Sequence, residues 1–314
     1  MDELKALRLA YGEALVELGG KNENIIVLDA DLAHATYTCL FQNAHKDRFF
    51  NMGIAEQNMV GVAGGLALSG FIPFVSTFAM FGTGRAYEQV RNTICYPNLN
   101  VKLALTHSGI TVGEDGGSHQ TIEDIALMRV LPNMTVIVPC DAVEMKKAVY
   151  AAVGYKGPVY LRIARSPSPV IMKEDYDFVI GKGNVLAEGK DICIIATGIM
   201  VPEALAAARE LSGNGISASV VNIHTIKPLD EELVLTMAKK SRAVVTVEEH
   251  SVIGGLGSAV AETLIGKVNV EMKRIGIEDK FGQSGKPAEL MKEYGLTSEN
   301  IVLECRKLVA EKIR

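Results

Sequence analysis

The segment Gly113-Glu114-Asp115-Gly116-Gly117-Ser118-His119-Gln120 is the most informative stretch of the chain. It is a glycine-rich polar loop that follows an apolar strand and carries an aspartate and a histidine. Earlier in the chain, Asn51-Met52-Gly53-Ile54-Ala55-Glu56-Gln57-Asn58 places one carboxylate, Glu56, at the start of an otherwise apolar helix. Polar groups at strand ends and helix starts are typical of an active site built on a parallel sheet.

The first half of the chain alternates between two kinds of apolar segment. Short β-rich segments at residues 27–28, 71–75, 101–105, 135–138 and 159–163 alternate with segments of helical spacing at residues 3–19, 55–69, 82–95, 121–130 and 141–153. This alternation predicts a mostly parallel sheet that is covered by helices on both faces. We therefore expect an α/β domain over residues 1–165.

The pattern breaks after this domain and then resumes. Residues 166–190 begin with Ser166-Pro167-Ser168-Pro169 and continue with charged residues and glycines, which is the composition of a linker. Residues 191–314 form a second series, with strands expected at 192–196, 219–223, 243–247 and 270–275 and helices at 201–212, 256–265, 286–294 and 297–312. The sequence thus predicts two α/β domains.

Composition excludes several classes of protein. The net charge of −5 over 314 residues gives no basic surface for nucleic acid. No apolar run reaches the roughly 18–20 residues that span a bilayer, and the first residues lack the basic and apolar regions of a secretory signal. The five cysteines lie far apart, which indicates reduced thiols. We expect a cytoplasmic protein.

Seven candidate side chains fall at predicted strand ends or just beyond them: Asp31, Glu56, Phe78, His107, Asp115, His119 and Arg165. In open parallel sheets, ligands bind at the carboxyl ends of the strands, so this placement favours one crevice. Placement alone does not name a reaction.

Each candidate also has a purely structural interpretation. Glu56 is either a solvated first-turn acid that the helix dipole stabilises, or a carboxyl group in an apolar crevice that exchanges a proton. Phe78 and Phe81 are either core aromatics or a stacking platform. His107 and His119 flank one polar loop, which favours a binding site, but they lack the spacing of metal ligands. We expect no metal ligand in this chain.

Several motifs resemble those of one family. Gly53-Ile54-Ala55-Glu56-Gln57-Asn58-Met59 resembles the thiamine-diphosphate-activating motif of the transketolase superfamily, and Thr77-Phe78-Ala79-Met80-Phe81 resembles its pyrimidine-stacking segment. Similar stretches continue in the same order at residues 106–120, 129–134, 223–230 and 248–259. The resemblance covers almost the whole chain and corresponds to the second half of a transketolase.

The resemblance implies a role for each candidate residue. Glu56 would hydrogen-bond the aminopyrimidine ring of thiamine diphosphate and act with His119 in catalysis. The other cofactor contacts would come from Asp31, Phe78 and Phe81. The remaining contacts would be to the sugar phosphate, with hydroxyl contacts from Asp115 and His119 and phosphate contacts from Arg8, His107 and Arg165.

The chain departs from the family pattern at three places. Gly82-Thr83-Gly84 stands where the family has a third stacking aromatic. Thr36 stands near the position of a phosphate-binding serine and is expected to bind the substrate in its place. The Gly-Asp-Gly tripeptide that holds Mg²⁺ on the cofactor diphosphate does not occur in the sequence. The resemblance therefore implies the C-terminal subunit of a split transketolase of the pentose phosphate pathway. An N-terminal partner subunit would hold the diphosphate and Mg²⁺, and two such pairs would form a heterotetramer.

Other functions stay open at this point. The β subunit of a 2-oxoacid dehydrogenase has the same architecture, and a deoxyxylulose-phosphate synthase contains the same half joined to the missing one. A non-catalytic regulatory partner subunit is the alternative outside enzymes. The 113–120 loop and the arginines Arg8 and Arg165 favour sugar phosphates as substrates.

Overall fold

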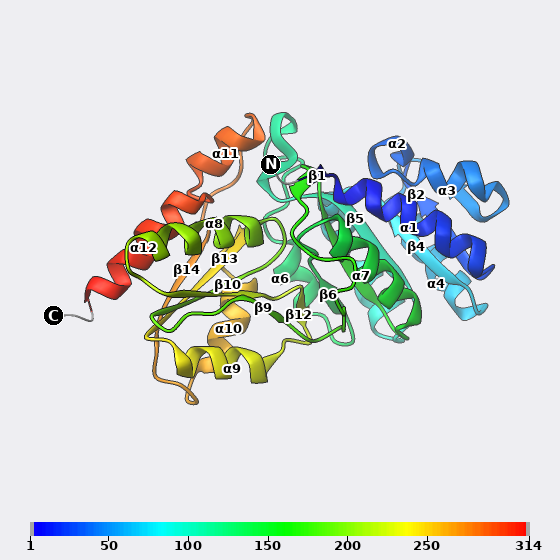
Figure 1. The fold of residues 1–314 in the computed structure, drawn as a ribbon. Coiled ribbons are helices and arrows are strands. Elements are labelled where there is room, and N and C mark those ends of the chain that lie inside the picture. Colours follow the sequence, from blue (N-terminus) through cyan, green and yellow to red (C-terminus); the bar gives the residue numbers. More distant parts are fainter. Residues whose placement is uncertain (1–2, 312–314) are drawn as a thin grey trace.

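The computed structural model describes residues 3–311 and contains two large sheets, each covered by helices (Figure 1). The first sheet has seven strands in the order β12-β6-β7-β5-β4-β2-β3. Their bounds are β2 Ile25–Asp29, β3 Phe49–Asn51, β4 Ile72–Ser76, β5 Lys102–Ser108, β6 Thr135–Ile137, β7 Val159–Ala164 and β12 Thr225–Lys227. All pair in parallel except β12, which adds antiparallel to β6.

Two sets of helices cover the first sheet. On one face α1 (Leu7–Lys21) and α7 (Ala142–Gly154) share a core cluster with the strands. The other face is covered by α4 (Glu56–Leu68), by α6 (Asp124–Arg129) and by a helical segment made of η2 (Met80–Arg85), α5 (Tyr87–Gln89) and η3 (Val90–Cys95). The short helices α2 (Ala33–Thr36), α3 (Cys39–Ala44) and η1 (Lys46–Arg48) connect β2 to β3.

The second sheet has five strands in the order β14-β13-β10-β11-β9. They are β9 Asn184–Ala187, β10 Ile192–Ala196, β11 Ala218–Asn222, β13 Ala243–Ser251 and β14 Glu271–Ile277, and β9 alone is antiparallel. One face packs on α8 (Met200–Gly213) and α12 (Ser298–Glu311), and the other on α9 (Glu231–Lys240) and α10 (Leu256–Leu264). α11 (Pro287–Glu293) lies beside η4 (Ile110–Asp115) of the first domain (Figure 1).

The α/β fold class predicted from the sequence is confirmed, with local differences. The first helix begins at Leu7, because Leu4–Lys5 (β1) pairs antiparallel with Ser168–Pro169 (β8). β8 and β9 both lie in the predicted linker, so parts of this segment pair with neighbouring strands. The expected helix 82–95 begins at Met80 and contains two π-helical segments, which insert extra residues into the turns.

Helix α9 was not predicted, although its ends carry ordinary signals. The Asp230 side chain caps its first turn by accepting a hydrogen bond from the Leu233 N–H. Acidic residues occupy its first turn and lysines its last, as the helix dipole favours. Its buried face is made of Val234, Met237 and Ala238.

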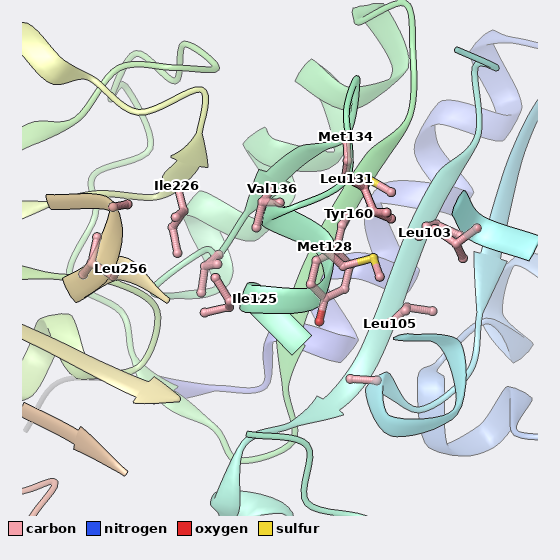
Figure 2. Close-up of a cluster of buried hydrophobic side chains, with 14 of the residues drawn as sticks. Leu103, Leu105, Ile125, Met128, Leu131, Met134, Val136, Tyr160, Ile226 and Leu256 are labelled. Carbon is pink, nitrogen blue, oxygen red and sulfur yellow. The ribbon is translucent and has the colours of Figure 1, made fainter. Parts of the chain in front are cut away.

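The two domains share one hydrophobic core cluster. Figure 2 shows Ile226 and Leu256 of the C-terminal half beside Ile125, Val136 and other side chains of the first domain. Ile226, Leu256, Ile125 and Val136 are each at most 1% exposed. Because this cluster is continuous across the boundary, we expect the two domains to be held in a fixed orientation.

A buried carboxylate adds a polar contact between the domains. Glu144 of α7 accepts hydrogen bonds from Asn222 Nδ2 of β11 at 2.8 Å, from the Tyr176 hydroxyl at 2.9 Å and from the Cys140 N–H at 2.7 Å. Burial raises the pKa of the Glu144 carboxyl to about 7, although the hydrogen bonds from Cys140 and Tyr176 oppose the shift.

We predict that Glu144→Gln changes how stability depends on pH. A carboxyl whose pKa is raised by folding contributes stability that is full below about 4.5, its ordinary value, and lost as pH rises through about 7. The variant has no such titration. Thermal unfolding from pH 4.5 to 8 should therefore favour the wild type most at the acidic end, with the advantage falling by on the order of 3 kcal/mol. A difference that is constant across this range would contradict the assignment.

Candidate active site

The site begins where β5 ends. His107, one residue before the end of this strand, has a backbone φ of 58°, which is uncommon for a residue other than glycine. The chain then leaves the sheet and returns, and the base of this loop is closed by a hydrogen bond from the Gly109 N–H to the Thr121 carbonyl at 2.9 Å. The polar segment recognised in the sequence therefore lies beside the carboxyl edge of the first sheet.

Four predicted site residues form one aromatic group. The ring of Phe78, which follows β4, stacks on His107 at 3.8 Å between centroids and on Phe81 at 5.9 Å. His119 from the loop meets Phe81 edge-on at 5.3 Å and Phe78 at 6.3 Å. The structure therefore brings together segments from the ends of two neighbouring strands and from the polar loop.

Glu56 is joined to this group through an arginine. It is the first residue of α4 and is 2% exposed. Its two carboxylate oxygens accept from Arg85 Nη1 at 3.1 and 3.0 Å, and the Arg85 guanidinium lies over the Phe81 ring at 4.6 Å. A planar nitrogen-containing ring that stacks on Phe81 and bonds to Glu56 would have to take the place of the guanidinium.

Arg85 was not among the site residues predicted from the sequence. It lies in a segment predicted as an ordinary amphipathic helix, and π-helical turns change which residues share a face. The nearest signal was its position shortly after the two phenylalanines.

Positive charge gathers on the other side of the aromatic group. Arg8 of α1 donates from Nε and Nη2 to the Arg165 carbonyl at 3.3 and 3.2 Å, and from Nη1 to the Ala35 carbonyl. Burial first, and then the charges of Arg8, Arg165 and His119, lower the pKa of the His107 imidazole to about 3. His107 is thus neutral near pH 7 and faces two permanent cations, an arrangement suited to an anion.

The remaining candidates lie at the edge of the site or below its surface. Asp31 is exposed, has a φ of 65° and accepts from Asn51 Nδ2 at 2.9 Å. Asp115 is exposed at the end of η4. Thr36 is fully buried, and its hydroxyl donates to Asp29 Oδ2 at 2.8 Å. The structure therefore places Thr36 inside the protein and gives its hydroxyl a protein partner.

Two family models match consecutive parts of the chain. The model of the transketolase pyrimidine binding domain matches residues 4–169, and that of the transketolase C-terminal domain matches residues 181–301. The chain belongs to the transketolase family.

Individual transketolase relatives agree over nearly the whole chain. A protein of Methanocaldococcus jannaschii described as "Putative transketolase C-terminal section" is 54% identical over 95% of this chain and 94% of its own length. The "6-deoxy-6-sulfo-D-fructose transketolase subunit SqwH" of a Clostridium species is 44% identical over 98% and 95%. A solved structure described as "Split gene transketolase, inactive beta4 tetramer" is 52% identical, covers 97% of this chain and 98% of its own, and superposes with a TM-score of 0.91.

The transketolase family implies thiamine diphosphate and a divalent cation, and the residues present fit one end of this cofactor. A buried carboxylate next to stacked aromatic rings suits the aminopyrimidine ring. Within residues 3–311 there is no group of three or more His, Cys, Asp or Glu side chains that could hold a metal ion. The same residues contain no helix long and apolar enough to cross a bilayer.

We predict that the His107 imidazole does not titrate between pH 5 and 8. Its lowered pKa keeps it neutral in the folded protein, whereas an unfolded histidine gains a proton near its ordinary value of 6.5. His107 should therefore favour unfolding as pH falls below about 6.5. The measurement is NMR of ¹³C-labelled histidine rings, with the His107 signal assigned by its loss in His107→Gln. A midpoint near 6.5 for that signal would show that the ring is not desolvated as described.

Proposed function

We propose that this chain is the C-terminal subunit of a split transketolase. With thiamine diphosphate, it would transfer a two-carbon ketol unit between sugar phosphates in the cytoplasm, as part of the pentose phosphate pathway. The observation that carries the proposal is the position of the Glu56 carboxyl, which is buried at the start of α4. Arg85 bonds to this carboxyl and lies over the Phe81 ring, so the acid and the ring are close together. An acid and an aromatic platform in this relation are what a pyrimidine ring requires.

Glu56 would act as the acid of the cofactor site. Thiamine diphosphate, when bound, supplies the nucleophilic carbon and the electron sink of the reaction. The Glu56 carboxyl would hydrogen-bond the aminopyrimidine ring nitrogen and favour the imino tautomer. Its burial supports this role, because water competes weakly for a desolvated hydrogen bond. Arg85 bonds to both carboxylate oxygens in this structure, so it would have to release at least one of them before the ring nitrogen could bond to it.

The polar side chains around the aromatic group would bind the sugar phosphate. Arg8 and Arg165 would receive the phosphate, since guanidinium groups offer paired donors to its oxygens. Neutral His107 would add a hydrogen bond without a further charge. The substrate hydroxyls would be bound by Asp115 and His119, while Asp31 would lie near the cofactor. Thr36 has no part in this proposal, because its hydroxyl is buried against Asp29.

A second subunit would complete the site. A diphosphate needs a cation held by oxygen ligands, and the described residues offer no such cluster. We therefore assign Mg²⁺ and the diphosphate mainly to an N-terminal partner subunit, with two pairs related by two-fold symmetry in a heterotetramer. The solved relative described as a split-gene transketolase, with its inactive β4 tetramer, supports a division of the enzyme between two chains.

A sulfonated sugar is a second candidate substrate. The relative named as a 6-deoxy-6-sulfo-D-fructose transketolase subunit matches nearly the full length of this chain. A sulfonate and a phosphate both present oxygens that Arg8 and Arg165 can bind. Because both arginines can bind either group, the two sugars are to be compared directly.

We predict ketol transfer from xylulose 5-phosphate to ribose 5-phosphate only when this chain is mixed with its N-terminal partner, thiamine diphosphate and Mg²⁺. Glu56→Gln in the same mixture should lower kcat by at least roughly 100-fold, the scale of a lost proton-transfer group, while its melting temperature stays near that of the wild type. A coupled assay of the aldose and ketose products measures the rate. The same mixtures are then tested with 6-deoxy-6-sulfofructose and with pyruvate.

Three outcomes would count against the proposal. Robust transfer by this chain alone would refute the division between subunits, and near-normal transfer by Glu56→Gln would remove Glu56 from its role. Turnover of pyruvate alone would instead favour a 2-oxoacid dehydrogenase or a deoxyxylulose-phosphate synthase. A preference for the sulfonated sugar would keep the reaction and change its substrate.

A further inference from the structure

The loop that carries Asp115 and His119 is held from outside its own domain. It runs from Gly109 to Gln120, between Ser108 at the end of β5 and Thr121, which forms an isolated bridge with Ser108. The C-terminal domain contacts it at two places, once through a strand end and once through the segment 281–287. A loop that binds substrate hydroxyls has to keep its shape, so these contacts bear on recognition.

Glu249 makes the first contact. It lies near the carboxyl end of β13, is 2% exposed, and accepts a hydrogen bond on Oε1 from the Thr111 N–H at 2.7 Å. A Cβ atom added to Gly109 would lie 2.2 Å from the Glu249 carboxyl carbon, and the φ of Gly109 is 76°. The loop therefore reaches this carboxylate only because position 109 has no side chain.

An arginine keeps Glu249 in place. Arg162 of β7 donates from Nη2 to the Glu249 carbonyl at 2.9 Å, and its Nη1 lies 3.9 Å from Glu249 Oε2. The same guanidinium pairs with Asp124 of α6 at 2.6 Å. All three side chains are nearly or fully buried. A buried carboxylate needs both a cation and hydrogen bonds, and here Arg162 and Thr111 supply them from the first domain.

The segment 281–287 makes the second contact. Gln120 at the end of the loop donates from Nε2 to the Gln283 carbonyl of the C-terminal domain at 2.9 Å. The same nitrogen donates to the carbonyl of Gly113 in the first half of the loop at 3.0 Å, so both halves are joined to the C-terminal domain. Gly117 runs so close to Gly282 that an added Cβ would lie 2.8 Å from its carbonyl oxygen. The loop is thus packed between β13 and this segment.

We propose that Glu249 is a positioning residue for the reaction. It acts through the Thr111 amide and sets the pose in which the 109–120 loop presents Asp115 and His119 to the substrate hydroxyls. This gives the C-terminal domain a part in substrate recognition. The sugar-binding part of the inference rests on the proposed function, whereas the restraint on the loop stands on the contacts alone.

The test compares Glu249→Ala with Glu248→Ala in the complex with the partner subunit. Glu248 is the neighbouring residue on β13 and equally buried, but its oxygens accept from the Leu256 and Gly257 N–H groups of its own domain, both at 2.7 Å. We expect both variants to lower Tm. Only Glu249→Ala should raise the KM for sugar phosphates, by roughly tenfold for one charged hydrogen bond, with a smaller change in kcat.

Two further variants separate positioning from general damage. Glu249→Gln keeps an oxygen of the same reach for the Thr111 N–H and should restore a KM near that of the wild type. If Glu249→Ala does not fold, Glu249→Asp keeps the charge beside Arg162 and withdraws the acceptor from Thr111, so it should raise KM. An equal KM in Glu249→Ala and Glu248→Ala, or no restoration by Glu249→Gln, would overturn the proposal.

Hydrogen exchange tests the loop without any assay of turnover. Amides of peptides covering residues 109–120 should exchange faster in Glu249→Ala than in Glu248→Ala or the wild type. Equal exchange in all three would overturn the positioning role. If the wild-type complex shows no ketol transfer, the proposed function fails, and the exchange data still decide whether Glu249 holds the loop.

Discussion

The parallel pairing of the first sheet is the constraint on which the site depends. Because β2, β4, β5 and β7 run in the same direction, their carboxyl ends meet at one edge. The last residues of these strands and the turns that follow them carry Phe78, His107 and Arg165, and the start of α4 adds Glu56. Residues more than one hundred positions apart in sequence therefore surround one aromatic group. The packing of α1 against the same sheet brings Arg8 to it.

In the proposed enzyme, this chain would carry one end of the cofactor site and the partner subunit the other. Its acid and aromatic rings suit a pyrimidine ring, and its arginines suit the anionic end of a sugar, but the described residues hold no cluster for a metal-bound diphosphate. In the proposed split enzyme, a second chain would complete this surface. The shared core and the contact between Glu249 and the polar loop show that the C-terminal domain is part of this surface.

Sequence alone predicted the parts of the site that follow from local pattern. The strand-end rule predicted that Phe78 and His107 would lie together, and the structure places their rings in contact. Their roles remain predictions. Arg85 was missed because π-helical turns are not visible in apolar periodicity. Glu249 was missed because its contact joins segments that are distant in the sequence. The burial of Thr36 was missed because its hydroxyl bonds to Asp29, which no sequence motif marks.

A shared cofactor site is tested most directly by calorimetric titration of thiamine diphosphate with Mg²⁺ into this chain alone, into the partner subunit alone and into their mixture. If the cofactor site is shared, the mixture should bind the cofactor, and this chain alone should bind it far more weakly because it offers only the ring end. Binding by this chain alone that is as tight as that of the mixture would contradict a cofactor site shared between two subunits.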